Sequence, residues 1–293
     1  MKQRIITGFV FALAMAASVI PGYWSIWPPV VLIVVVALII STEITTALRH
    51  CGLRPCFPMV IAGSLLCLLP LAVRYVQPRQ SASLIQSAVS LSITLFALLV
   101  FMAAGSIIRL LIDGPLAFPD AIATGASIVY IAFPLTCAIT MLSHLDGGWL
   151  WLIIGLSAPW VSDTFAFFSG SLFGRHLIVP SLSPKKTLEG SIGGIVGSML
   201  SQLQIFYLFR HFLSSSSVLL ATSLLFALFS GLLLSIASQL GDWLASGFKR
   251  YCSIKDFGHI LPGHGGLLDR FDSAFFTLPM TMLLAILFQF IGS

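Results

Sequence analysis

Apolar segments long enough to cross a bilayer recur along the whole chain, and this recurrence limits the fold more than any other feature. A membrane-spanning helix needs about 17 to 25 mostly apolar residues. Charged residues make up only 9% of the 293 residues, and hydrophobic residues make up 58%, whereas soluble domains are roughly a quarter charged. A water-soluble fold is therefore excluded, and we predict an all-α polytopic membrane protein with about nine transmembrane helices. The predicted spans are 5–24, 27–43, 57–76, 84–104, 119–141, 149–169, 190–209, 218–240 and 272–291.

The sequence contains no internal repeat and no long linker. We expect an N-terminal bundle of about four helices over 1–118 and a C-terminal region of about five helices over 119–293, joined as one continuous membrane domain. Segment 84–118 fits either one span with an interfacial helix or two short spans. The first 22 residues have the composition of a signal peptide, but the first span of a polytopic protein has the same composition, and we expect it to be retained.

The five cysteines show neither CxxC pairs nor the regular spacing of a disulfide framework. Their number is odd and their neighbours are mostly apolar, which is typical of small packing residues. We therefore predict that they form neither disulfides nor metal sites. They are Cys51, Cys56, Cys67, Cys137 and Cys252.

The distribution of positive charge predicts the orientation in the membrane. Cytoplasmic loops carry an excess of Lys and Arg. If the N-terminus is cytosolic, twelve of the fifteen Lys and Arg residues fall on the cytosolic side, and only Arg74, Arg79 and Arg210 fall outside. This asymmetry favours nine spans with a cytosolic N-terminus. The two longest polar segments, 170–189 and 241–271, then both face the cytosol.

Four of the ten acidic residues fall at the cytosolic ends of predicted spans: Asp163, Asp242, Asp269 and Asp272. Ionisable groups at such depths are costly and usually functional or paired. Asp269 and Asp272 are three residues apart and share a face of a helix, and capping of the ninth helix is an equally good interpretation of Asp272. Because the acids supply hard oxygen ligands without a Cys/His cluster, they favour a Mg²⁺ site.

Basic residues in "SPKKTLEG" (183–190) and "FKRYCSIKD" (248–256) fall on the same predicted face. Attraction to anionic lipid headgroups explains such charges when they are taken alone. Beside the acids and the glycine-rich "LPGHGG", a phosphate-handling site explains the whole set, because Gly265 and Gly266 let backbone N–H groups approach an oxyanion. For His264, a general base and a structural histidine both remain open.

Residues 246–272, "SGFKRYCSIKDFGHILPGHGGLLDRFD", resemble the signature of the phosphatidate cytidylyltransferase family, the CDP-diacylglycerol synthases. A second block, "SDTFAFFSGSLFGRHLIVPSLSPKKTLEGSIGG" (162–194), is similar to the family's other well-marked stretch. Together the blocks cover about the C-terminal half, and nothing residue-specific is inferred for the first four spans.

The resemblance implies an integral-membrane enzyme that transfers the cytidylyl group of CTP to phosphatidate and releases pyrophosphate. It implies Mg²⁺, with K⁺ as a second cation, and a homodimer. It also implies metal ligation by Asp242 and Asp269, and we add Asp163 and Asp272 as further candidate ligands. The predicted catalytic residues are Asp242, Asp269, Lys249, Arg250, Lys255 and Arg270. The predicted substrate-binding residues are Ser183, Lys185, Lys186, Glu189, His264, Gly265 and Gly266.

Two other functions fit parts of the pattern. A CTP-dependent lipid-alcohol (polyprenol) kinase would use similar groups but release CDP. A transporter for an anionic solute would use a basic vestibule, but such proteins tend to carry internal repeats and midplane sites. We expect a multi-pass protein of a prokaryotic plasma membrane with its active site facing the cytoplasm, and no nucleic-acid partner.

Overall fold

A computed structural model describes residues 2–76, 84–180, 183, 185–213 and 219–292 of the chain. These residues form helices and short 3-10 turns, and the described part contains isolated β-bridges but no strand. The all-α prediction is therefore confirmed for the described residues. In chain order the elements are α1 (Lys2–Val19), η1 (Ile20–Tyr23), α2 (Trp27–His50), α3 (Phe57–Ser64), η2 (Leu65–Leu68), α4 (Leu69–Val76), α5 (Leu84–Asp113), η3 (Pro115–Ala117), α6 (Phe118–His144), α7 (Gly148–Phe173), α8 (Leu188–Leu213), α9 (Leu220–Tyr251), α10 (Leu268–Phe271) and α11 (Ala274–Gly292).

Nine helical segments of the described chain are long and apolar enough to cross a membrane, as predicted. Segment 84–118 contains one long helix, α5, followed by the short turn η3, so the two-short-span alternative is wrong. The predicted ends of the second and eighth spans were too early, because α2 continues to His50 and α9 to Tyr251. Hydropathy marks the apolar part of a helix, whereas the helix itself continues through the polar residues that follow.

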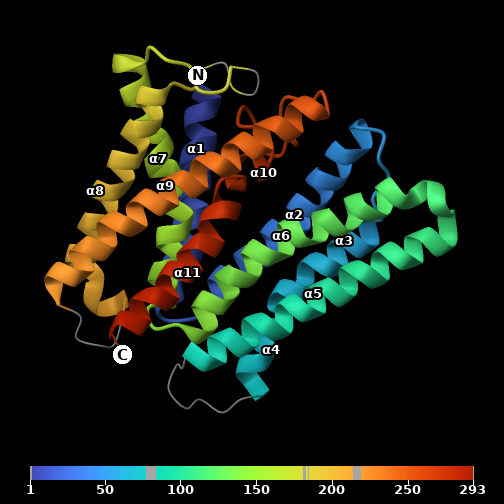
Figure 1. Ribbon diagram of the computed structural model, residues 1–293, viewed down its shortest axis with the longest axis horizontal. Helices are drawn as coiled ribbons and strands as arrows, with labels where there is room; N and C mark the ends of the chain where they lie inside the picture. Colours follow the sequence, from blue (N-terminus) through green and yellow to red (C-terminus); the bar gives the residue numbers. More distant parts are fainter. Residues whose placement is uncertain (1, 77–83, 181–182, 184, 214–218, 293) are drawn as a thin grey trace.

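The bundle separates its connections between two ends (Figure 1). The N-terminus, the connection between α7 and α8, and the C-terminal end of α9 lie at one end, and the C-terminus lies at the other. The described parts of the two predicted polar segments therefore share one end of the molecule. Arg79, which the orientation prediction placed outside, is not among the described residues.

Small residues allow α7 and α8 to pack closely. A Cβ atom at Gly194 would lie 2.9 Å from the Ser162 carbonyl oxygen of α7, so glycine is needed where the two backbones approach. Many apolar side chains of α2, α6, α11 and the first half of α7 join one core. Hydroxyl groups inside the helices, such as those of Ser41 and Thr45, donate to carbonyl oxygens one turn earlier, which satisfies them without water.

The structure pairs Cys51 with Cys252 in a disulfide, with the two Cα atoms 4.8 Å apart. The prediction that no cysteine forms a disulfide is therefore wrong. The two residues are the C-caps of α2 and α9, and 201 residues separate them. Spacing along the sequence contains no sign of a pair that forms only when two helix ends meet. Cys56, Cys67 and Cys137 are free.

Candidate functional site

Lys249 near the C-terminal end of α9 forms an ion pair with Asp269 of α10. The Lys249 Nζ atom donates to Asp269 Oδ1 at 2.9 Å and lies 3.9 Å from Asp272 Oδ2. The side chains of Lys249 and Asp269 are only 16% and 6% exposed. Asp269 and Asp272 therefore approach one ammonium group, as expected for acids three residues apart on one helical face.

The backbone around Asp269 holds its other carboxylate oxygen. Oδ2 accepts the N–H groups of Phe257 at 2.8 Å and Gly266 at 2.9 Å. Gly265 has a φ angle of +83°, and a Cβ atom there would lie 2.9 Å from the same oxygen. A side chain at this position would be strained and would collide with the carboxylate. The Gly266 N–H therefore supports Asp269 in this structure.

A second ion pair joins Lys186, in the connection after α7, to Asp242 of α9. Lys186 Nζ donates to Asp242 Oδ2, and each side chain is about a quarter exposed, at 28% and 26%. Burial lowers the pKa of the Lys186 ammonium from its ordinary value, while the nearby Asp163 and Asp272 carboxylates raise it and Lys249 lowers it further. Both ion pairs therefore belong to one electrostatic cluster.

Backbone pairing in the α7–α8 connection positions Lys186. Ile178 N–H donates to the Lys186 carbonyl at 3.1 Å, and Leu188 N–H donates to the His176 carbonyl at 2.8 Å. Glu189, predicted to bind substrate, accepts the Arg175 N–H at 3.0 Å and contacts the His176 ring at 2.6 Å. In this structure Glu189 organises the connection that carries Lys186.

Arg270 of α10 bonds to the backbone of His264 in the loop 252–267, and both residues were predicted to belong to the site. Arg270 donates from Nη2 to the His264 carbonyl at 2.7 Å and from Nε at 3.2 Å. The His264 ring packs near Gly8 of α1, 3.6 Å from where a Cβ atom would lie. Arg270 therefore closes the loop, and the structure gives His264 a packing contact with the first helix.

The remaining predicted residues differ in their exposure. Asp272 accepts the Ser273 N–H at 2.6 Å, just before α11 begins at Ala274, and capping of α11 by Asp272 stays a prediction. Asp163, Lys185, Arg250 and Lys255 are exposed, and Ser183 is partly buried. The structure leaves their predicted roles in catalysis and binding as predictions.

Sequence reasoning missed Glu43, a buried acid of α2 that is 4% exposed. Its Oε1 atom accepts the Leu267 N–H at 2.8 Å and its Oε2 atom accepts the Leu268 N–H at 2.7 Å. The available signal was a lone acid inside an apolar span, which is costly unless it is partnered. Its partners lie 224 and 225 residues away, so no local motif could identify them.

The donor chemistry of the acids fits a magnesium ion. Mg²⁺ is usually bound by one or two carboxylates together with water and substrate phosphates. Asp242 and Asp269 are such carboxylates, and each already holds a lysine ammonium group, so both positions suit a cation. No group of three or more His, Cys, Asp or Glu side chains that could hold a metal occurs in the described residues. The full set of four predicted ligands therefore stays a prediction.

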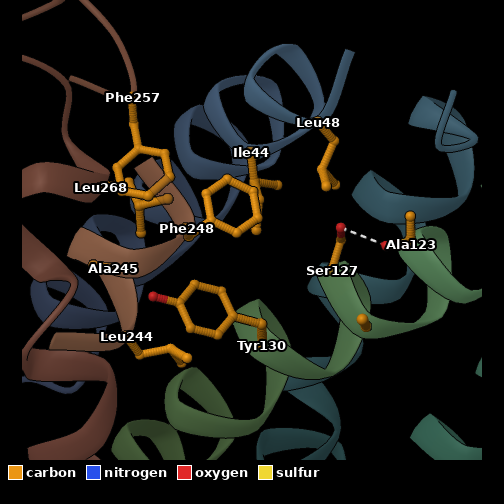
Figure 2. A pocket seen from close by; sticks show the side chains of 11 residues that line it. Ile44, Leu48, Ala123, Ser127, Tyr130, Leu244, Ala245, Phe248, Phe257 and Leu268 are labelled. Carbon is orange, nitrogen blue, oxygen red and sulfur yellow. Dashed lines mark hydrogen bonds between the residues drawn. The ribbon is translucent and has the colours of Figure 1, made fainter. Parts of the chain in front are cut away.

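An apolar cavity of about 250 Å³ lies beside the charged cluster, between α2, α6 and α9 (Figure 2). Phe257 and Leu268 form part of its wall, and the backbone N–H of Phe257 also donates to the Asp269 carboxylate. The Lys249 ammonium lies 5.2 Å from the centre of the Phe257 ring. A charged region and an apolar cavity therefore share one wall. The lining residues are Ile44, Leu48, Ala123, Ala126, Ser127, Tyr130, Leu244, Ala245, Phe248, Phe257 and Leu268.

The fold is that of a polytopic membrane protein. Toward one end of its helical bundle, paired lysine and aspartate side chains form a polar site that suits anions and a cation. A family model for the cytidylyltransferase family matches residues 2–288. The chain belongs to this family.

Bacterial relatives match parts of the chain at 40–45% identity. A phosphatidate cytidylyltransferase of Staphylococcus haemolyticus is 41% identical over 136 residues, which are 46% of this chain and 49% of the relative. One of Staphylococcus aureus (strain COL) is 45% identical over 127 residues, 43% of this chain and 45% of the relative. One of Staphylococcus epidermidis is 41% identical over 139 residues, 47% and 50% of the two chains. The matched region spans about half the length of these curated relatives.

Proposed function

We propose that this protein transfers the cytidylyl group of CTP to phosphatidate, giving CDP-diacylglycerol and pyrophosphate. The observation that carries the proposal is the buried Lys249–Asp269 pair, which shares a wall with an apolar cavity. One substrate is a water-soluble polyphosphate and the other combines a phosphate with hydrocarbon chains. Membership of the cytidylyltransferase family and the names of the bacterial relatives support the same reaction.

The reaction needs no nucleophile from the protein. A phosphate oxygen of phosphatidate, already ionised at neutral pH, forms a new bond to the α-phosphorus of CTP. The bond from that phosphorus to the oxygen bridging to the β-phosphorus breaks, and pyrophosphate leaves with the bonding electron pair. Both substrates are anions, so the main task of the protein is to position them and to offset their repulsion.

Lysine side chains of the cluster suit this task. Lys249 and Lys186 sit on carboxylates that hold them in place, and each ammonium has three donors, so each has donors left for phosphate oxygens. We assign the positioning of substrate phosphates to these two lysines, with the exposed Lys185, Arg250 and Lys255 adding positive charge. Arg270 would act by closing the loop and by donating to a substrate phosphate from the guanidinium nitrogen that does not bond to His264.

Asp242 and Asp269 would hold Mg²⁺, and Asp163 and Asp272 are further candidates. When bound, the ion supplies charge neutralisation at the phosphate oxygens. K⁺ as a second cation remains an expectation of the family resemblance. The backbone donors at Phe257 and Gly266 orient the Asp269 carboxylate, which is the contribution of the chain itself.

The apolar cavity accounts for a lipid substrate. Ser127, one of the few polar residues in its wall, donates its hydroxyl to the Ala123 carbonyl at 2.7 Å. Apolar cavities stay dry and accept hydrocarbon. We assign the cavity to an acyl chain of phosphatidate, whose headgroup would reach Lys249 past the Phe257 ring. Ala126 and Leu244 in the lining are exposed on α6 and α9, which provides a lateral entrance.

The proposed location follows from the substrates. Phosphatidate stays in the bilayer and CTP arrives from the cytosol, so the site must face the cytoplasm at the depth of the headgroups. The bacterial relatives support a plasma membrane. A homodimer remains an expectation of the family resemblance.

Product analysis tests this function. Purified protein is given phosphatidate, Mg²⁺ and CTP labelled at the α-phosphorus, and the label is followed together with pyrophosphate and CDP. The proposal predicts one labelled lipid and one pyrophosphate for each CTP consumed. Release of CDP with an unlabelled lipid product would indicate a lipid-alcohol kinase, and movement of an anion across liposomes without turnover would indicate a transporter.

A further inference from the structure

Glu43 places a carboxylate among apolar side chains of α2, in a position that burial alone would make unfavourable. Its side chain belongs to a span whose other buried members include Ile40 and Ile44. A buried carboxylate persists when hydrogen bonds replace its lost hydration. Glu43 has two such bonds, and both come from the backbone where the loop of the proposed active site leads into α10.

Through these two bonds, a residue of α2 caps the distant helix α10. Leu267 is the N-cap residue of α10 and has no side-chain cap of its own. The first N–H groups of a helix lack partners within that helix, and Glu43 accepts two of them, from Leu267 and Leu268. The second span therefore supplies the cap for the short helix that contains Asp269.

Two glycines of the loop make room for the carboxylate. A Cβ atom at Gly258 would lie 2.6 Å from Glu43 Oε1, and one at Gly266 would lie at the same 2.6 Å. Any other residue at either position would collide with the Glu43 side chain. The two glycines therefore allow the loop to pack against Glu43. This role is separate from the predicted close approach of the loop backbone to a substrate phosphate.

Glu43 and Asp269 hold consecutive backbone groups of one segment. The Gly266 N–H donates to Asp269, and the next two N–H groups, of Leu267 and Leu268, donate to Glu43. Loss of the Glu43 acceptors would leave two buried donors unpaired, which is costly. Because Asp269 lies one residue after Leu268, freedom in this backbone would change the direction of its carboxylate.

We propose that Glu43 is a positioning residue that fixes residues 257–268 so that Asp269 presents its carboxylate to a bound divalent cation. This inference rests on the proposed function, in which Asp269 is a metal ligand. It assigns to the second span a role in the active site. Glu43 acts through the backbone and does not itself touch the substrates.

Substitution of Glu43 in the full-length protein, purified in detergent, tests the proposal with two measurements that do not depend on turnover. The first is hydrogen exchange of peptides from 257–272, and the second is binding of Mn²⁺ alone, followed by electron paramagnetic resonance. Glu43→Gln keeps the size of the side chain but replaces one acceptor with a donor. We expect exchange in 257–272 to quicken about tenfold and Mn²⁺ affinity to fall at least about tenfold.

Two further variants separate positioning from general stability. Glu43→Asp keeps two acceptor oxygens on a shorter stem, so its Mn²⁺ affinity should lie between those of the wild type and Glu43→Gln. Ser41→Ala is the matched control, because Ser41 is also buried on α2 but bonds to Ala37 and Ser64. It should lower the melting temperature without changing Mn²⁺ affinity or exchange in 257–272.

A perturbation from the opposite side makes the test independent of whether the Glu43 variants fold. Gly258→Ala pushes a methyl group toward Glu43 Oε1 and should reproduce the loss of Mn²⁺ affinity. In the double variant with Glu43→Asp, the carboxylate is retracted from the new methyl group. The double variant should therefore lose less Mn²⁺ binding free energy than the sum of the losses in the two single variants.

Unchanged Mn²⁺ affinity in Glu43→Gln and Gly258→Ala, or a wild type that binds no Mn²⁺, would overturn the proposal. A protein that binds Mn²⁺ in a Glu43-dependent way but forms no labelled lipid would keep the positioning role and refute the proposed reaction.

Discussion

Lys249 and Asp269 bring two opposite charges together where little water reaches them. Their side chains are 16% and 6% exposed, whereas those of Lys186 and Asp242 are 28% and 26% exposed. Removal of one partner from a buried pair leaves an uncompensated charge, which costs far more than the same change at the surface. The two pairs therefore have different consequences for stability, although both serve the same proposed site.

We predict that Lys249→Met destabilises the protein by about 3 kcal/mol, seen as a lower melting temperature in detergent. Lys186→Met is the matched comparison, and because water already reaches its pair, it should lower the melting temperature much less. Equal losses in the two variants would contradict the interpretation that the Lys249–Asp269 pair is the enclosed one.

Residues of the site were predictable to different extents. The signature at 246–272 predicted that Lys249 and Asp269 serve one site, and the spacing of Asp269 and Asp272 predicted that they share one face of a helix. The partners of Glu189 and Arg270 were not predictable, because a charged side chain is as well suited to a backbone carbonyl or amide as to a phosphate. Glu43 lay outside every motif, since its role depends on a contact between distant segments.

At the scale of helices and loops, the apolar cavity depends on the arrangement of α2, α6 and α9. α2 contributes the branched side chains of Ile44 and Leu48 to its wall, α6 and α9 contribute small and aromatic side chains, and the loop after α9 contributes Phe257. Hydropathy predicted these spans and their number. It could not predict the cavity, because the same apolar faces would also suit helices that pack without a gap.

Filling the cavity should affect long acyl chains more than short ones. We predict that Ala126→Phe lowers kcat/KM for long-chain phosphatidate at least about tenfold relative to a short-chain, water-dispersible phosphatidate, because the new ring takes space otherwise open to hydrocarbon. Ala221→Phe, at an exposed position on α9 outside the cavity wall, is the control. An equal loss with both substrates would show that the cavity does not hold an acyl chain.

Helix ends explain why Asp242 and Lys249 were predicted to follow the eighth span, although both lie on the helix that forms it. The predicted eighth span stopped at 240, while α9 continues to Tyr251. At 1.5 Å per residue, the 32 residues of α9 extend well beyond an apolar bilayer core of about 30 Å. Asp242 and Lys249 therefore lie on the same rigid helix, and sequence patterns tuned to apolar runs end before both.

At the scale of the whole molecule, one end of the bundle collects the N-terminus, the described part of the α7–α8 connection and the C-terminal end of α9 (Figure 1). The charge asymmetry of the sequence predicts that this end is cytosolic. Nine alternating spans in the described part of the chain place the N-terminus and the C-terminus at opposite ends, as Figure 1 shows. Which of the two ends faces the cytosol stays a prediction. The disulfide between Cys51 and Cys252 ties α2 to α9 at the same end.

Labelling with a membrane-impermeant maleimide tests the orientation. In a Cys56→Ser background, we predict that Lys185→Cys is labelled only in inside-out vesicles, because it belongs to the proposed cytosolic end. Val76→Cys, 84% exposed at the end of α4, should be labelled only in right-side-out vesicles. The reverse pattern would contradict a cytosolic site.

The most direct test of the central claim compares two isosteric substitutions in the labelled-CTP assay. Asp269→Asn keeps the shape of the side chain but removes the charge proposed to hold the metal, whereas Asp113→Asn does the same to an acid paired with Arg109 at the end of α5. We predict that Asp269→Asn loses at least about a hundredfold of CDP-diacylglycerol formation, while Asp113→Asn keeps activity close to that of the wild type. Full activity in Asp269→Asn would contradict the account.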